Sequence, residues 1–505
     1  MSLGTTGLGL AFLRALNSGL GLLLSIALAA VFGVTREVDA LFVAMSVAVF
    51  LARDLSRVIR VAAVPCLVES DEGRGSQDFA ANFHMMVTML AVAVTAAVWC
   101  GAPLIVKLTS PGFDPVASQH ASRLLRLLAP SLLMFMLFGS AQSVFHARHR
   151  FLLPELSETL WRVLAIGALF TLGKQGGIEA YASGLTVAAF AQWGFLFLAA
   201  TRYGFRVLPI RWAPIQMSLL KPFWLGAIVV LCSVIQMQIE GVLDRAMISF
   251  MAPGSIALFS YAERLAHMMP ILLSTSLLTP WLPAIARIQA QVGDPRRLAK
   301  QGSLFLAALG TLLAIVIAWA ARDMVAFLLL RGKFDASSAH VVIISVQVFT
   351  LGIPAIFCVQ CLAGLYVVSR DLKAMAQVGL VAVLTHAAFN LLLLPWGVPG
   401  IALSSVASIW IVAFYLWWRV KAREQVWFPW SRFTGAIAAV LIVLFGASRL
   451  PWAPIRLTVG AAAAWAAYTA VMWPAILRMQ AYEREATRPT NSAADGMSDR
   501  KILKP

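Results

Sequence analysis

Long apolar runs recur from one end of the chain to the other, and the short segments between them hold most of the Arg and Lys residues. A transmembrane helix needs about 20 mostly apolar residues in a row. The pattern therefore predicts an all-α polytopic membrane protein. We expect fourteen transmembrane helices, at about residues 8–33, 38–65, 83–107, 120–146, 152–173, 179–201, 219–251, 255–288, 299–330, 337–368, 374–395, 397–421, 429–449 and 453–476.

Composition argues against a soluble protein. Of the 505 residues, 60% are hydrophobic and only 12% are charged, whereas soluble domains carry about 25% charged residues. A soluble chain of this length would need a polar exterior that so few charged residues cannot supply. The net charge of +17 does not indicate nucleic-acid binding, because the basic residues lie mainly in short loops.

The distribution of basic residues predicts the orientation of the helices. With the N-terminus in the cytoplasm, twenty-three of the 40 Lys and Arg residues fall in cytoplasmic segments and about seven in the opposite loops. Cytoplasmic loops of membrane proteins carry this kind of positive excess. We therefore expect both termini in the cytoplasm. The first apolar run has no basic segment before it, so we interpret it as a helix and not as a cleaved signal peptide.

Two sequence landmarks occur twice, which indicates an internal repeat. Ala40-Leu41-Phe42 recurs as Ala257-Leu258-Phe259, and Phe113-Asp114 recurs as Phe334-Asp335, at nearly the same separation along the chain. Two separations of similar size suggest two halves of six helices each. Because six is even, the halves share one orientation and should be related by a pseudo-twofold axis along the membrane normal.

The repeat divides the chain into four parts. We expect an N-terminal lobe over residues 1–205 and a C-terminal lobe over 206–425. The last two helices, within 426–476, lie outside the repeat. Residues 477–505 are polar and charged, which predicts a disordered cytoplasmic tail.

Three arginines lie inside the second predicted span, where charge is costly. Arg53, Arg57 and Arg60 follow i, i+4, i+7 spacing, so they share one face of a helix. The planar guanidinium binds phosphate oxygens with two parallel hydrogen bonds. The pattern favours a cationic wall for an anionic substrate such as a pyrophosphate. The alternative is that the side chains, above all Arg60, extend to the cytoplasmic interface.

The seventh and eighth predicted spans carry further charges. Glu240 and Asp244 lie in one, and Glu263 and Arg264 lie in the other. A very short turn joins the two spans, so their charges lie at similar depth. Two interpretations remain open, a structural cluster of ion pairs or a substrate contact made by Arg264. Further candidates for the same substrate site are Arg14 and Asp39.

Polar residues one helical turn apart occur in the eleventh and twelfth predicted spans. Together with two acidic residues of the seventh span they could bind a coupling ion, either Na⁺ or H⁺. They could equally join helices through hydrogen bonds. The candidate residues are Asp244, Glu240, His386, Asn390, Ser404 and Ser408. No nucleotide-binding glycine loop or metalloenzyme motif occurs in the sequence, so we expect no cofactor and no enzymatic activity.

Five short motifs, taken in order, resemble the MurJ/MviN family of lipid II flippases. The superfamily of this family also holds polysaccharide flippases and MATE drug exporters. The resemblance covers roughly residues 8–475. The motifs are Val38-Asp39-Ala40-Leu41-Phe42-Val43, Ser110-Pro111-Gly112-Phe113, Arg150-Phe151 with Pro154, Tyr261-Ala262-Glu263-Arg264-Leu265, and Gly332-Lys333-Phe334.

The resemblance implies a fold and a function. It implies a V-shaped bundle of two lobes with alternating access, a cationic cavity for a lipid pyrophosphate sugar, and a groove formed by the last two helices for the polyprenyl tail. Arg264 matches an arginine that the family uses in its cavity, and Arg53 lies near another. The setting would be the bacterial inner membrane, with membrane lipids and cell-envelope synthesis proteins as partners.

The sequence also departs from the family pattern. The first helix of the family carries arginines where this chain has residues 17–25 without charge, and Arg14 lies about one turn earlier. This leaves a second cargo open, another undecaprenyl-linked saccharide such as an exopolysaccharide unit. A MATE-type multidrug exporter is the other alternative, but it would need an acidic or aromatic cavity.

Overall fold

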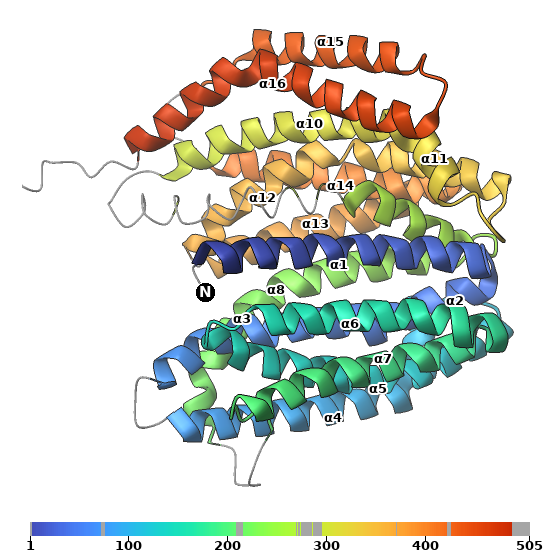
Figure 1. The fold of residues 1–505 in the computed structure, drawn as a ribbon, viewed down its shortest axis with the longest axis vertical. Helices are drawn as coiled ribbons and strands as arrows, with labels where there is room; N and C mark the ends of the chain where they lie inside the picture. Colours follow the sequence, from blue (N-terminus) through green and yellow to red (C-terminus); the bar gives the residue numbers. More distant parts are fainter. Residues whose placement is uncertain are drawn as a thin grey trace, which may run out of the picture. The chain divides into compact units, whose positions relative to one another are not determined.

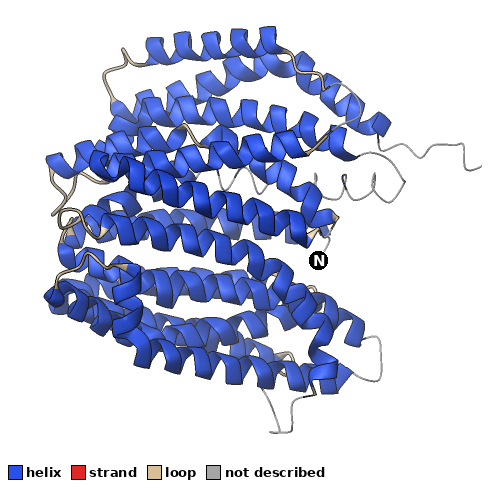
Figure 2. Cartoon of the chain, turned by 180° about the vertical axis from the view of Figure 1, so that it is seen from behind, coloured by secondary structure: helices blue, strands red, loops and turns tan. Residues whose placement is uncertain are grey.

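The structure, a computed structural model, describes residues 3–71, 76–208, 216–268, 295–369, 371–421 and 426–486, with single positions 270, 273 and 285. All regular elements within these ranges are helices, and none is a strand (Figure 1, Figure 2). The predicted all-α class is confirmed. Several predicted features lie outside the described residues: half of the span 255–288, the basic residues Arg74, Arg211, Arg287, Arg370 and Arg423, and the tail beyond 486.

The helices follow the predicted order of apolar runs. They are α1 (Leu3–Phe32), α2 (Arg36–Met45), η1 (Ser46–Leu51), α3 (Ala52–Asp71), α4 (Ser76–Thr109), α5 (Pro115–Ala147), α6 (Leu152–Ala168), η2 (Leu169–Gly173), α7 (Lys174–Arg202), α8 (Met217–Ile248), α10 (Pro295–Leu328), α11 (Ala336–Thr350), α12 (Ile353–Val368), α13 (Leu372–Leu393), η3 (Leu394–Trp396), α14 (Gly397–Arg419), α15 (Trp430–Ala447) and α16 (Ala453–Ala486). Residues 255–268 are helical as well.

Long apolar helices account for most of the predicted spans. In the described part of the chain, nine stretches are long and apolar enough to cross a membrane, or ten if the bent pair Ala336–Thr350 and Ile353–Tyr366 is one span. Two of the nine, Leu152–Arg202 and Lys373–Arg419, contain 51 and 47 residues. A straight helix of that size would measure about 70 Å or more, over twice the hydrocarbon core of about 30 Å. Each therefore contains two predicted spans, while the total of fourteen stays a prediction.

A glycine with positive φ interrupts each of these two stretches. Gly177 has a φ of 74° and Gly397 a φ of 67°, values that residues with a Cβ rarely adopt. Gly33 and Gly254, which also have positive φ, are separated along the chain by nearly the same interval as Gly177 and Gly397. Both intervals match the separation of the sequence landmarks. The backbone thus supports the internal repeat.

The second predicted span is built from α2, η1 and α3 in succession. Thr35 caps α2, because its side-chain oxygen accepts a hydrogen bond from Val38 N at 3.3 Å. The π-helical η1 follows directly and contains a wider turn, a feature that is often found at functional sites. Arg53 lies two residues after this turn, at the start of α3.

The chain forms two compact units. Unit 1 comprises Met1–Leu272, Ala321–Thr350 and Leu372–Ser408, and unit 2 comprises Leu273–Ala320, Leu351–Asp371 and Ile409–Pro505. Within unit 1, the buried helix α5 packs against α2, α3, α4 and α7. The predicted lobe boundaries at residues 205 and 425 stay predictions.

Two loops of unit 1 make reciprocal contacts with helix ends. In the loop before α5, the N–H of Gly112 donates a hydrogen bond to Ser249 Oγ at 2.8 Å, just after α8. In the loop before α11, Lys333 N donates to the carbonyl of Ala30 in α1 at 3.0 Å. The predicted repeat relates these loops to each other, and it also relates α1 to α8. Each predicted half therefore contributes a loop to the other half, at the predicted extracytoplasmic side.

Unit 2 has an apolar core of its own, formed by α10, α15 and α16. The antiparallel helices α15 and α16 pack along each other (Figure 1). The buried residues of this core include Phe305, Leu312, Val440, Leu444, Tyr468 and Met472. α16 continues past the predicted end at 476 to Ala486, because the charged segment that follows is rich in residues with high helix propensity, such as Ala, Arg and Glu.

Candidate functional site

Arg53 is held against two aromatic rings in unit 1. Its Cζ lies 4.3 Å from the ring centroid of Trp161 in α6 and 5.2 Å from that of Phe135 in α5. Its Nε and Nη2 are buried and have no hydrogen-bond partner in the described part of the protein. Buried donors without partners are uncommon and costly, so each one needs an explanation such as a ligand or an ordered water.

The other two arginines of this helix face lie in different surroundings. Arg57 pairs with Asp54 in the same helix, with Nη2 3.2 Å from Oδ1, and its side chain is more than half exposed. Asp54 also accepts a hydrogen bond from Gln238 in α8 at 2.7 Å. The Nε of Arg60 is buried without a partner among the described residues. The predicted cationic face is therefore divided: one ion-paired arginine lies between two others that keep free donors.

Arg14 is joined to the helix that follows α5. Its Nε lies 3.2 Å from Glu155 Oε1 in α6, and the amide of Asn17 donates to the backbone carbonyl of Glu155 at 3.3 Å. Thr159 donates to the Asn17 side chain at 3.0 Å. Arg14 thus lies in an ion pair between α1 and α6.

Arg264 has surroundings similar to those of Arg53. Its Cζ lies 5.5 Å from the ring centroid of Phe42 in α2 and 5.2 Å from that of Phe50 in η1. Nη1 donates a hydrogen bond to Ser25 Oγ in α1 at 2.7 Å. Glu263 precedes Arg264 in the chain and is only partly buried. These contacts bring the second and eighth predicted spans together.

Asp39 lies at the N-terminus of the helix over residues 255–268. Its Oδ2 accepts a hydrogen bond from Gly254 N at 2.6 Å, and its Oδ1 accepts one from Ala257 N at 2.9 Å. Arg36 Nη1 lies 3.8 Å from Oδ2. A carboxylate in this place satisfies free N–H groups and interacts favourably with the helix dipole. In this conformation both oxygens of Asp39 have protein partners.

The predicted coupling residues form one buried cluster in unit 1. Asp244 Oδ1 lies 2.6 Å from His386 Nε2 and accepts a hydrogen bond from Asn390 Nδ2 at 2.9 Å. Ser404 Oγ donates to Oδ1 of the Asn390 side chain. The structure therefore brings together three helices, α8, α13 and α14, through side chains that the sequence singled out.

The other two candidates lie at the edge of this cluster. Ser408 donates to the Ala382 carbonyl at 3.1 Å, and its Oγ lies 3.0 Å from Thr385 Oγ1. Glu240, one turn before Asp244 in α8, accepts a hydrogen bond from Gln236 at 3.1 Å. Glu240 thus lies one turn from Asp244 in α8, and Ser408 lies one turn from Ser404 in α14.

Sequence reasoning missed the aromatic and hydroxyl partners of the two arginines. A ring that supports an arginine looks the same in the sequence as a ring in a core, and Trp161 lies three predicted spans after Arg53. The missed residues are Trp161, Phe135, Phe42, Phe50 and Ser25.

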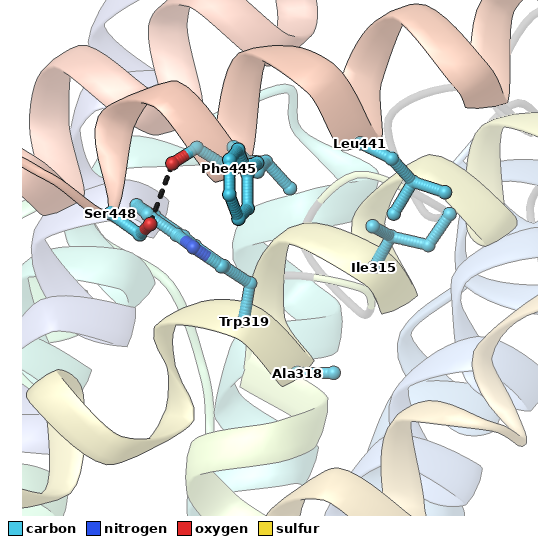
Figure 3. Close-up of a pocket in the computed structure, with 7 residues that line it drawn as sticks. Ile315, Ala318, Trp319, Leu441, Phe445 and Ser448 are labelled. Atoms are coloured by element: carbon cyan, nitrogen blue, oxygen red, sulfur yellow. Dashed lines mark hydrogen bonds between the residues drawn. The ribbon is translucent and has the colours of Figure 1, made fainter.

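Unit 2 contains an apolar pocket of about 400 Å³. Figure 3 shows Trp319 of α10 pointing towards Phe445 of α15 and towards Ser448, the residue that directly follows α15, with Ile315 and Leu441 further along the same two helices. Ser448 Oγ donates to the Phe445 carbonyl at 2.6 Å, so the only hydroxyl of the lining is satisfied at the C-terminal end of α15. The pocket therefore offers an apolar surface. The resemblance places a tail groove at the last two helices, and this pocket uses α15 together with α10.

Comparisons with known proteins agree with this architecture. The family model "Lipid II flippase MurJ" matches residues 28–467. The "Probable lipid II flippase MurJ" of Haemophilus influenzae is 26% identical over 435 residues, which are 82% of this chain and 85% of the relative. The "Lipid II flippase MurJ" of Burkholderia cenocepacia is 23% identical over 438 residues, or 83% of this chain and 84% of the relative.

Solved structures share the fold. A lipid II flippase MurJ in an inward closed conformation matches with a TM-score of 0.79 and 19% identity, over 92% of this chain and 99% of that one. A multidrug resistance MATE family transporter in an inward-facing conformation matches with a TM-score of 0.66 and 14% identity, over 80% and 94%. At these identities the likeness concerns the fold alone.

Proposed function

This chain belongs to the MurJ family of lipid II flippases, and from that premise we propose that it moves lipid II from the cytoplasmic to the periplasmic leaflet of the bacterial inner membrane. The family match over residues 28–467 favours this cargo over an exopolysaccharide unit and over the drugs of a MATE exporter. The single observation in the structure that carries the proposal is Arg53, a buried guanidinium with unpartnered donors in a predicted span.

The chemistry of the substrate fits this arginine. A lipid-linked saccharide of this kind carries a pyrophosphate, whose oxygens accept charge-assisted hydrogen bonds from a guanidinium. Nε and Nη2 of Arg53 are the donors left free. Arg264 provides a second guanidinium on the helix that begins at residue 255. Arg57 is a weaker candidate for binding the pyrophosphate, because Asp54 already neutralises its charge.

The apolar part of the substrate needs a separate surface. We propose that the pocket between α10 and α15 receives part of the polyprenyl tail. Its lining residues Ile315, Trp319, Leu441 and Phe445 offer a surface that a hydrocarbon chain can cover, and burial of such area contributes about 25 cal/mol per Å².

The cluster around Asp244 is proposed to couple transport to an ion. At its centre, Asp244 is a buried carboxylate that contacts the imidazole of His386 and the amide of Asn390, both on a second helix. Na⁺ and H⁺ are both candidates, and the contact of 2.6 Å with His386 favours H⁺, because imidazole and carboxylate can share or release a proton. Both chain termini are proposed to lie in the cytoplasm, and cell-envelope synthesis proteins are proposed as partners.

The proposal is tested by complementation of a strain depleted of its own lipid II flippase. Wild-type protein should restore growth and prevent lipid II from accumulating. Arg53→Ala should abolish both effects at normal membrane levels of protein, and Arg53→Lys should restore them only in part, since lysine lacks the planar fork. Arg123→Ala is the matched control, because Arg123 is exposed and pairs with Glu179 at 3.3 Å. Failure of the wild-type chain to lower the lipid II level would overturn the proposal.

A further inference from the structure

Arg53 lies in a corner made by two aromatic rings that are themselves packed together. The rings of Phe135 and Trp161 are 5.9 Å apart and inclined by 63°. Both side chains are buried, with 2% and 4% of their surface exposed. Tightly packed rings of this kind have little freedom to rotate. The face of Trp161 therefore determines where the guanidinium of Arg53 can lie.

The two carboxylates that act electrostatically on Arg53, Asp54 and Glu158, are committed to other cations. Asp54 pairs with Arg57 at 3.2 Å and also accepts from Gln238. Glu158 pairs with Arg162 at 3.3 Å, one helical turn away. No ion pair within 4.0 Å involves Arg53 in the described ranges, where its guanidinium lies against the ring faces of Phe135 and Trp161.

This kind of support differs from a salt bridge in one respect. A carboxylate occupies the N–H donors of a guanidinium, whereas an aromatic ring attracts the cation through its π face and leaves in-plane donors free. The unpartnered Nε and Nη2 of Arg53 fit this description. The aromatic corner thus holds a charge in place and keeps its hydrogen-bonding capacity for another group.

Arg264 shows the same arrangement independently. Its guanidinium lies near the rings of Phe42 and Phe50, and its one hydrogen bond in the described structure goes to a neutral hydroxyl, that of Ser25. Phe42 is fixed by an edge-on contact with Tyr261 at 5.5 Å. Both guanidiniums are therefore supported by aromatic pairs from other elements.

We propose that Trp161 and Phe50 are positioning residues, which hold Arg53 and Arg264 as charged forks with free donors for the pyrophosphate of the substrate. This inference rests on the proposed function, because the pyrophosphate is the group that the forks would bind. Trp161 acts through Arg53, and Phe50 acts through Arg264. Neither ring needs to touch the substrate.

The test measures binding of farnesyl pyrophosphate, a short lipid pyrophosphate, to the purified full-length chain in lipid nanodiscs. Trp161→Leu should weaken binding by about threefold to tenfold, the range expected for loss of a cation–π contact. Trp161→Phe should weaken it less, since it keeps a ring face. Trp193→Leu is the control, because Trp193 is a tryptophan of the same unit whose ring stacks on Phe197 in α7.

A double-mutant cycle separates positioning from general stability. In an Arg53→Ala background, Trp161→Leu should have no further effect on binding, because the group that it positions is absent. Additive losses would overturn the inference and reduce Trp161 to a packing residue. The same cycle with Arg264→Ala and Phe50→Leu tests the second ring. If Trp161→Leu does not fold, the cycle with Trp161→Phe decides by the same criterion.

The outcomes also distinguish this inference from the proposed function. If Arg53→Ala and Arg264→Ala both bind farnesyl pyrophosphate like the wild type, the arginines are not the substrate contacts and the proposed site is wrong. If the arginine variants lose binding and Trp161→Leu and Phe50→Leu do not, only the positioning role is wrong. We expect the arginine and ring variants to weaken binding of farnesyl pyrophosphate and to leave binding of farnesol, which lacks the charge, unchanged.

Discussion

The carboxylate of Asp39 accepts a hydrogen bond at 2.6 Å from the backbone N–H of Gly254, a residue of the other predicted half. The same carboxylate accepts a second one from Ala257 N at 2.9 Å. Asp39 lies near the start of α2, and Ala257 lies near the start of the helix that the repeat makes equivalent. A residue of one predicted half therefore caps a helix of the other half, in addition to the two loop contacts that Gly112 and Lys333 make between the halves.

Replacement of Asp39 should weaken this connection. Asp39→Ala removes both acceptors, and loss of a helix cap costs about 0.5–2 kcal/mol. We expect a lower thermal midpoint of the purified protein and faster labelling of a cysteine placed at Ala257. Asp39→Asn should have a smaller effect, because one oxygen remains. Thr35→Ala, which removes the cap within α2 alone, should lower the midpoint without changing the labelling. Equal labelling rates in Asp39→Ala and wild type would show that the hydrogen bonds of Asp39 do not limit access to position 257.

The buried contact between Asp244 and His386 leads to a prediction about coupling. Asp244→Asn keeps the size and one acceptor oxygen but cannot carry the charge, so transport should lose its dependence on a proton or sodium gradient. His386→Gln should remove only a proton dependence. The measurement is lipid II accessibility at the periplasmic face while each gradient is collapsed in turn. Ser183→Ala is the control, since Ser183 is exposed on α7 and donates a hydrogen bond to the Glu179 carbonyl of the same helix at 3.1 Å. Unchanged ion dependence in Asp244→Asn would leave the cluster as a purely structural contact.

The pocket of unit 2 predicts a dependence on tail length. Ala318 lines the pocket between α10 and α15, so Ala318→Trp should fill it. Transport of lipid II with its full polyprenyl tail should fall severalfold, while binding of a short-tailed pyrophosphate should persist. Ile442→Trp is a suitable control, because Ile442 lies on α15 with 72% of its surface exposed. Equal losses for long and short tails would assign the pocket another role.

The excess of basic residues in alternate loops predicts the topology. Alkaline phosphatase fused after Pro505 should be inactive, because it folds correctly only in the periplasm, whereas a fluorescent protein at the same place should glow. The same pair of fusions placed at Gly177 should give the reverse result, since that turn joins the fifth and sixth predicted spans on the outer side. An active phosphatase at the C-terminus would contradict the even number of spans.

Local patterns in the sequence identify the helices and several candidate residues, but not the long-range partners. Apolar runs and their lengths predict helices such as α4 and α5 closely, because a bilayer constrains both composition and length. His386 and Asn390 are recognisable because polar residues one turn apart are rare in a span, and Asp244 because a carboxylate there is costly. The contacts among these three side chains agree with the expected grouping, whereas their role in ion coupling stays a prediction.

Other features depend on packing that no local pattern encodes. Asp39 is a substrate candidate in the sequence, and only the folded chain places it at a helix terminus beside Gly254. Trp161 and Phe50 look like ordinary apolar residues of a membrane helix, so their place beside arginines depends on how α3, α6 and η1 pack. The π-helical turn in η1 also gives no sequence signal, since its residues are ordinary for a membrane helix.

That turn has a genetic consequence. A π-helical turn accommodates one residue more than an α-helical turn, so η1 absorbs a single inserted residue without interrupting the span. Deletion of one residue between Ser46 and Leu51 would therefore convert η1 to regular α-helix while the segments on either side keep their orientation. The same deletion in α3, between Arg53 and Arg57, meets no such wide turn and would rotate the residues after it by about 100° relative to those before it. A one-codon change is thus absorbed at η1, whereas in α3 it turns Arg57 and Arg60 away from the face that carries Arg53.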